Sequence, residues 1–146
     1  MKYCAEAHQK LVIAGGNRPW LLRLRAMFLG FDWAGPVSGE KKAELLSDAK
    51  ALIFPIQWEE PFGLVMAEAW LSGTPVLAHP RGSAKELVTS EVGALPASPE
   101  AWQELLSKPL TFSAEACRDY AVKNFHYLKM AENYESYYLK AMGEGL

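Results

Sequence analysis

Short apolar runs alternate with helix-like segments from residue 10 to about residue 107 of this chain. The runs are residues 10–16, 31–37, 51–54, 75–78 and 92–95. Runs of this length, closed by Gly, Pro or polar turns, are typical of strands in a parallel sheet that is buried on both faces. The pattern predicts an α/β fold of the Rossmann-like, doubly wound type, with helices on both faces and ligands beyond the carboxyl ends of the strands.

The segments between and after these runs carry apolar residues three and four positions apart, as amphipathic helices do. Helices are expected over the tail of residues 2–9, from Pro19 to residue 28, over residues 40–47, from the turn at Pro61 and Gly63 to residue 71, and over residues 82–88, 100–107, 114–124 and 127–142. Three helices in succession would therefore close the fold. The helix that ends near residue 71 is expected to turn Phe62, Val65, Met66, Ala69 and Trp70 to the core, and the helix of residues 40–47 to point Lys41 and Lys42 outward.

Length and composition indicate one globular domain over residues 1–146, with 50% hydrophobic and 22% charged residues. The formal net charge is −2, and the sequence has no cluster of Lys and Arg beyond Lys41 and Lys42. A basic surface for nucleic acid is therefore not expected.

Cys4 and Cys117 lack a Cys-x-x-Cys pattern, which favours buried free thiols over a disulfide. No apolar run reaches the ~18 residues that span a bilayer, and no signal peptide is evident, so a cytoplasmic location is expected.

The stretch from Pro55 to Trp70 combines two carboxylates with a helix start. Glu60 and Glu68 are eight positions apart, roughly 12 Å if the residues between them are helical. Unpaired amides and the positive dipole end of a helix favour phosphate, and Gly63 permits a close approach to the backbone. This spacing suits a long ligand that is held at two points. The alternative, in which Glu59 and Glu60 only occupy a favourable dipole position and Glu68 lies on a solvated face, stays open from the residues alone.

The same stretch resembles a known family. Glu60 and Glu68 match the Glu-x7-Glu motif of retaining glycosyltransferases with GT-B architecture. The wider similarity is to the sucrose-synthase and mannosyltransferase-like family, and it lies in residues 58–70, 72–76 and 81–83 with Glu86, in residues 10–16 and 33–37, and in the closing helices. The resemblance implies the C-terminal, donor-binding half of such an enzyme. The acceptor-binding N-terminal domain, and the first strand of the donor half with its Gly-Arg…Lys-Gly loop, are expected to be missing from residues 1–146.

The resemblance also implies roles for individual residues. Glu68 would accept hydrogen bonds from the ribose hydroxyls of a nucleotide sugar, and the catalytic residue Glu60 would contact sugar hydroxyls at the reacting end. The remaining donor-binding residues would act through backbone groups: Phe62, Gly63, Leu64 and Val65 toward the sugar and diphosphate, Val37 toward the base, and Gly15 and Gly16 by leaving room for phosphate.

The activity implied is glycosyl transfer with retained anomeric configuration from a UDP-, GDP- or ADP-linked sugar. The leaving diphosphate would be stabilised electrostatically, with no obligatory metal and no other cofactor. Without the cationic loop, the chain is expected to be a poor catalyst by itself. A nucleotide-sugar epimerase of the same architecture is disfavoured by the Glu-x7-Glu motif.

Several other residues near the expected cleft are weaker candidates. His79 could face a ligand, although a structural role is favoured. Arg81 and Lys85 could partly replace the missing cations, although ordinary surface charge is favoured. Trp58 is expected to pack rather than to stack on a base, and Ile56 departs from the small hydroxyl residue common in the wider family.

A different class of function is suggested by the last helix. Tyr134, Tyr137, Tyr138 and Met142 form an apolar stripe at helical spacing. If that stripe is uncovered, it could bind the missing N-terminal domain, another protein or a second copy of the chain. The alternative hypothesis is therefore an assembly or regulatory module that keeps the fold without catalysis.

Overall fold

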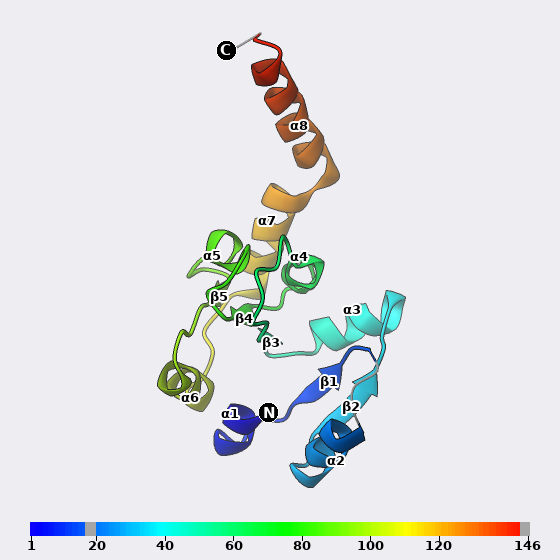
Figure 1. Ribbon diagram of the computed structural model, residues 1–146, viewed down its shortest axis with the longest axis vertical. Helices are drawn as coiled ribbons and strands as arrows, with labels where there is room; N and C mark the ends of the chain where they lie inside the picture. The colour runs from blue at the N-terminus through cyan, green and yellow to red at the C-terminus, as the bar shows by residue number, and fades with distance from the viewer. Residues whose placement is uncertain (17–19, 144–146) are drawn as a thin grey trace.

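The computed structural model describes residues 1–16 and 20–143 as five short strands and eight helices in strict alternation from β1 to α6 (Figure 1). The strands are β1 (Val12–Ala14), β2 (Asp32–Gly35), β3 (Leu52–Phe54), β4 (Val76–Ala78) and β5 (Gly93–Ala94). The helices are α1 (Lys2–Glu6), α2 (Trp20–Phe28), α3 (Gly39–Ser47), α4 (Leu64–Leu71), α5 (Ala84–Leu87), α6 (Pro99–Ser107), α7 (Ala114–Phe125) and α8 (Tyr127–Ala141). The predicted order of elements is confirmed; the expected start of a helix at Pro19 lies outside the described residues.

All strand pairs are parallel, as the doubly wound prediction requires. The hydrogen-bonded strands form two groups, β1 with β2, and β3, β4 and β5 in that order. The register pairs Val12 with Asp32 in the first group and Leu52 with Val76 in the second. The alternation of apolar runs predicted each strand, but it did not predict this division of the sheet.

Successive residues of the strands face two different hydrophobic clusters, because side chains alternate across a sheet. In β4, Val76 and Ala78 enter a first cluster, and Leu77 enters a second. The first cluster takes its buried residues from α3, α4, α5 and α7, whereas the second takes them from α1, α2 and α6. Helices therefore cover both faces of the sheet.

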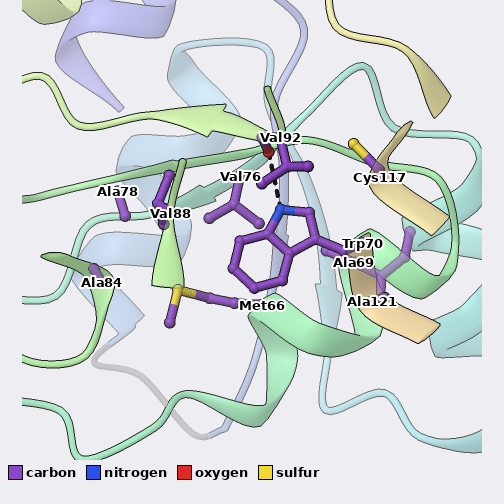
Figure 2. Close-up of a cluster of buried hydrophobic side chains, with 11 residues drawn as sticks. Met66, Ala69, Trp70, Val76, Ala78, Ala84, Val88, Val92, Cys117 and Ala121 are labelled. Carbon is purple, nitrogen blue, oxygen red and sulfur yellow. Dashed lines mark hydrogen bonds between the residues drawn. The ribbon is translucent and has the colours of Figure 1, made fainter. Parts of the chain in front are cut away.

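Trp70 of α4 lies at the centre of the first cluster (Figure 2). Its side chain is fully buried, and its Nε1 donates a hydrogen bond of 2.9 Å to the backbone oxygen of Val92. Its ring stacks on Phe125 with centroids 5.6 Å apart and meets Tyr120 edge to face at 5.2 Å. These contacts fix α4 against the sheet and against α7, and they thereby fix the position of the helix start.

The helix after β3 begins later than predicted. Gly63 has φ 74° and ψ 67°, in the left-handed region, so the helix cannot extend back through it to Pro61. Phe62, which was expected on the apolar face of the helix, therefore lies in the preceding loop with 38% of its surface exposed. Met66, Ala69 and Trp70 are buried as predicted.

The C-terminal helix α8 packs on α7 and extends away from the sheet at the top of Figure 1. None of its residues is buried. Among the described residues, no helix combines the length and the apolar character needed to cross a bilayer.

Candidate functional site at the start of helix α4

The start of α4 is shaped by Gly63. A Cβ at this position would lie 2.9 Å from Cε of Met66 and 3.1 Å from Cε1 of Phe54, so both the backbone conformation and the close packing require glycine. The amides of Leu64 and Val65 belong to the first turn, where an α-helix offers no intrahelical acceptor. Leu64 is 72% exposed. The positive end of α4 thus opens to the surface, where an anionic group can reach it.

Glu60 lies before the helix, in the loop of residues 56–63, and not within a continuous helix that also contains Glu68. The estimate of roughly 12 Å from helical rise therefore does not apply to this pair, because residues 60–63 are not helical. The Oε2 of Glu60 accepts a hydrogen bond of 2.8 Å from Nε1 of Trp58. Trp58, which was expected to pack rather than to stack on a base, keeps 58% of its surface exposed, and its indole nitrogen orients the Glu60 carboxylate.

The loop of residues 56–63 is joined to the loop that follows β4. The Ser83 amide donates to the backbone oxygen of Glu60 at 2.9 Å, and the Ser83 hydroxyl donates to the backbone oxygen of Phe62 at 2.9 Å. The Gly82 amide donates to Oε2 of Glu59 at 2.6 Å. A Cβ at Gly82 would lie only 2.5 Å from the backbone nitrogen and oxygen of Glu60. The two loops, residues 56–63 and 79–83, are consequently joined into one unit that we call the platform.

Glu68 lies in the second turn of α4 with 40% of its side chain exposed. Its Oε1 is 2.5 Å from Nζ of Lys42, a residue of α3. Lys42 was expected to point outward; instead, it turns toward α4 and keeps 33% of its side-chain surface exposed. No pattern in the sequence signals this pair, because its members belong to different helices.

The remaining predicted donor-binding residues follow the first two strands. Gly15 follows β1 with φ 137°, a conformation that favours glycine, and its amide donates to the backbone oxygen of Gly35 at 2.8 Å. Among the described residues, no atom lies within 4 Å of a Cβ built at Gly15 or Gly16, so these residues leave space there. Val37 is half-buried and directly precedes Ser38, the N-cap of α3. Since α3 carries Lys42, the ion pair with Glu68 connects this region to α4.

Other candidates from the sequence have structural roles or weak contacts. The Nδ1 of His79 accepts a hydrogen bond of 3.3 Å from Nε1 of Trp102, and the two rings meet edge to face. Arg81 lies 3.9 Å from Glu59, and both side chains are more than half exposed, so this pair contributes ~1 kcal/mol or less. Among residues 1–16 and 20–143, no three His, Cys, Asp or Glu side chains are grouped as a metal site would require.

The two cysteines are free and buried, as predicted, and they lie in different hydrophobic clusters. Burial raises the pKa of the Cys4 and Cys117 thiols above the usual value, so both retain their protons at neutral pH. They contribute no reactive thiolate to the site.

A shallow hollow of about 460 Å³ lies away from the helix start. It is lined by residues that precede or begin β1 and β2, including Lys10 and Asp32, whose exposed side chains form an ion pair of 3.2 Å. Ligands of doubly wound sheets bind at the opposite, carboxyl ends of the strands. The start of α4, with its loops, therefore remains the better candidate site.

A family model described as "Glycosyl transferases group 1" matches residues 3–132 of the chain. An uncharacterized glycosyltransferase of Methanocaldococcus jannaschii is 34% identical over 96 residues, which cover 59% of this chain and 23% of that protein. The matched region includes much of the chain but only a minor part of the relative.

Solved structures confirm the fold. AviGT4, a glycosyltransferase involved in avilamycin A biosynthesis, superposes over 97% of this chain with a TM-score of 0.74 and 24% identity. HepE of Anabaena, in complex with UDP and glucose, covers 92% with a TM-score of 0.70 and 20% identity. The sucrose-phosphate synthase of Thermosynechococcus elongatus covers 99% with a TM-score of 0.70. The chain spans less than half the length of each: 46%, 43% and 42%.

Proposed function

The chain belongs to group 1 of the glycosyl transferases, and from that premise we propose that it binds the donor, a nucleoside-diphosphate sugar, for glycosyl transfer with retained anomeric configuration. The donor lies along the start of α4. The observation that carries the proposal is the pairing of an open, positively polarised helix start with two carboxylates, Glu60 in the loop before it and Glu68 in its second turn.

In this arrangement each part of the donor faces protein groups that can bind it. The Glu68 carboxylate accepts hydrogen bonds from the ribose hydroxyls, and Glu60 accepts them from the sugar. The backbone amides of Phe62, Gly63, Leu64 and Val65 donate hydrogen bonds to the sugar and the diphosphate. Negative charge that develops on the departing diphosphate is stabilised by these fixed dipoles, and neither a metal nor another cofactor is required.

The loops after the first two strands complete the donor site. The open space at Gly15 and Gly16 admits phosphate without a steric clash, and the backbone at Val37 meets the base. The complexes of HepE with UDP and with UDP-glucose support a uridine donor as the first to test. The acceptor is held by polypeptide outside residues 1–146, so this chain alone is a poor catalyst.

Isothermal titration of the purified chain with UDP, GDP and ADP, and then with the corresponding glucose conjugates, tests the proposal. Glu68→Ala should weaken nucleotide binding by about 10- to 100-fold, the range for loss of a hydrogen bond to a charged group. Glu60→Ala should weaken the sugar nucleotide but not the bare nucleotide. Glu135→Ala, an exposed substitution in α8, is the control. Absence of binding by the wild-type chain, or unchanged affinity in Glu68→Ala, would contradict the proposal.

A second candidate function is suggested by α8. Tyr134 and Tyr138 lie with ring centroids 6.2 Å apart, and both are more than half exposed, as is Met142. An exposed stripe of large apolar side chains is typical of an interaction surface. If the chain acts as an assembly module, light scattering should show a mass that rises with concentration, and Tyr134→Ser with Tyr138→Ser should abolish the rise. A monomer at every concentration would argue against self-assembly.

A further inference from the structure

The face of α2 that points away from the sheet is apolar and exposed. Trp20 is 70% exposed and Phe28 78%, and Met27 is more than half exposed. With Leu24, these residues recur at the three- and four-residue spacing that places side chains on one face of a helix. The opposite face is marked by Ala26, which is fully buried in the second hydrophobic cluster. α2 therefore presents a group of large apolar side chains to solvent.

A second helix of the same length shows the usual pattern. α2 and α3 each have nine residues, and the exposed positions of α3 include Glu40, Lys41 and Glu44. Charged residues on the solvent side are typical of a helix that covers a sheet. Single apolar residues on a surface are normal, but a contiguous exposed group marks an interaction surface. The outer face of α2 is such a group.

Two arginines border this apolar face. Arg25 lies four residues after the exposed Leu21, so it continues one margin of the face. Arg23 lies four residues before Met27, at the other margin. Both arginines are exposed, and no carboxylate of the described residues forms an ion pair with either. The Arg23 guanidinium lies 5.8 Å from the centre of the Trp33 ring, a cation–π contact that holds its charge at this margin.

The sequence around α2 is positively charged in a chain that is acidic overall. Residues 7–31 contain no Asp or Glu, so all 17 acidic residues of the chain lie elsewhere. The basic residues of this stretch are Lys10, Arg18, Arg23 and Arg25. Asp32, the first acid after the stretch, is paired with Lys10 at 3.2 Å. An apolar face bordered by arginines is complementary to a surface with an apolar interior and anionic groups at its boundary.

We propose that α2 binds the surface of an anionic bilayer and lies in the plane of the membrane, with its outer face turned to the lipid. In helices of this kind, Trp, Phe and Leu occupy the apolar face, and the long side chains at its margins reach the lipid phosphates. A helix of nine residues is only roughly 13 Å long, too short to cross a bilayer. α2 therefore lies on the membrane and does not span it.

Other occupants fit this face less well. In a two-fold dimer the face would meet its own copy, so Arg23 and Arg25 would approach the same arginines, with no acid from residues 7–31 to neutralise them. Surfaces that bind nucleic acid are polar and basic, whereas the centre of this face is apolar.

The membrane face and the candidate donor site lie in different parts of the fold. α2 packs on β2, whereas α4 packs on β3, β4 and α7. In Figure 1, α2 and β2 lie at the end of the molecule opposite α8. The proposal thus goes beyond donor binding and does not rest on it.

Co-sedimentation of the purified chain with vesicles tests the proposal. One set of vesicles contains phosphatidylcholine alone, and the other contains equal parts of phosphatidylcholine and phosphatidylglycerol. At low salt the chain should bind the anionic set about tenfold or more tightly, and high salt should reduce the difference because it screens the charges. Absence of binding to the anionic vesicles, or equal binding to both sets, overturns the proposal.

Trp20→Ser with Phe28→Ser removes the centre of the apolar face and should abolish vesicle binding. Tyr134→Ser with Tyr138→Ser removes two aromatic side chains of α8 that are also more than half exposed, and it is the matched control. Serine at exposed positions leaves both hydrophobic clusters intact, so both variants should fold. Binding that survives in the α2 variant and is lost in the α8 variant overturns the assignment to α2.

Arg23→Gln with Arg25→Gln should weaken binding to the anionic vesicles by about 10- to 30-fold, since each cation near an anionic surface contributes about fivefold. Lys108→Gln with Lys129→Gln changes the net charge equally at exposed positions outside α2, and it should bind nearly as the wild type does. Equal weakening by the two pairs would mean that net charge alone drives the binding, which overturns the proposal.

Tryptophan emission reports contact with the lipid directly. Brominated acyl chains quench only those indoles that they touch. The wild type should lose emission on brominated anionic vesicles, whereas Trp20→Phe should not. Trp58→Phe, which removes another exposed indole, should be quenched as the wild type is. Quenching that persists in Trp20→Phe overturns the proposed orientation of α2.

Two further outcomes would assign the face to another occupant. Dimers that form without lipid and dissociate in Trp20→Ser with Phe28→Ser would identify a second copy. Binding of oligouridine that is lost in Arg23→Gln with Arg25→Gln, without any vesicle binding by the wild type, would identify nucleic acid. Either result overturns the proposal.

Donor binding is measured separately by the nucleotide titration. A chain that binds UDP but no vesicles would refute the membrane face alone. A chain that binds vesicles but no nucleotide would refute the donor site alone.

Discussion

Lys42 of α3 and Glu68 of α4 form an ion pair in which Nζ lies 2.5 Å from Oε1. Both side chains remain about a third exposed, at 33% and 40%. A pair with this much solvent contact contributes only ~1 kcal/mol or less to stability. Its main effect is on orientation, because it holds the Glu68 carboxylate toward α3. In the proposed site, Lys42 is therefore a positioning residue for the carboxylate that receives the ribose.

Replacing Lys42 by methionine should weaken UDP binding by about two- to fivefold. The substitution frees the Glu68 side chain, which must then be ordered when the nucleotide binds, at a cost of about 0.5–1 kcal/mol. Titration calorimetry measures the change. Lys108→Met, which removes a similar but exposed pair with Glu104 at 2.6 Å, is the matched control and should bind as the wild type does. Equal or tighter binding by Lys42→Met would show that the pair does not orient Glu68 for the ligand.

The elements of the fold could be predicted from sequence because their signals are local. β4 is an example: three consecutive apolar residues between turns indicate a strand that is buried on both faces, and all three are buried. The start of α4 was placed too early because an apolar pattern includes Phe62, whereas the left-handed backbone of Gly63 decides where the helix begins. Hydrophobic spacing alone does not report that conformation.

The sequence predicted those residues of the site that lie in one continuous stretch of the chain, but not the residues that contact them from other segments. The sequence places Glu60 and Glu68 near a helix start, but their partners come from elsewhere: Lys42 from α3, and Gly82 from the loop after β4. Contacts between segments that are distant in sequence leave no periodic pattern. The division of the sheet was missed for the same reason, since pairing between strands is not encoded within either one.

Gly82→Ala should destabilise the chain more than a change of backbone conformation can explain. The new Cβ would lie 2.5 Å from the Glu60 backbone, which can yield only if the two loops separate. Gly39→Ala is the matched control, because φ is 55° there against 50° at Gly82 and no atom of the described residues lies within 4 Å of a Cβ. Urea unfolding should show an additional loss of about 1–3 kcal/mol for Gly82→Ala. Equal losses would mean that the platform adapts without cost.

Gly63→Ala is the corresponding test of the helix start. Alanine at φ 74° pays the left-handed penalty of about 1–2 kcal/mol, and its Cβ also presses on Met66 and Phe54. Gly30→Ala, at φ 70° in open space, reports the penalty alone. We expect the larger loss of unfolding free energy at Gly63, measured by urea titration. A Gly63→Ala protein as stable as Gly30→Ala would show that the Met66 and Phe54 side chains move aside freely.

Trp70→Phe should cost about 1–3 kcal/mol of unfolding free energy. Phenylalanine keeps an aromatic ring beside Phe125 but leaves the buried oxygen of Val92 without the 2.9 Å hydrogen bond from the indole. Trp20→Phe, at a side chain that is 70% exposed, should change stability by about 0.5 kcal/mol or less. Urea unfolding measures both losses of unfolding free energy, which can be compared through the midpoints if the m-values are equal. Similar losses for the two substitutions would show that the Trp70 hydrogen bond does not hold α4 in place.

Stability should fall as the pH rises above 9, and the buried thiols should be one source of the fall. Burial raises the pKa of Cys4 and Cys117 above the usual 9.0. Below pH 9.0, folded and unfolded chains both keep these protons, so the thiols make no difference to the pH dependence. Above it, the unfolded chain releases protons that the folded chain still holds, which favours unfolding. Urea unfolding at pH 8.0 and 9.5 should therefore show a smaller decrease for the variant with Cys4→Ala and Cys117→Ala than for the wild type, whatever its absolute stability. An equal decrease in the two proteins would mean that the thiols titrate alike in both states.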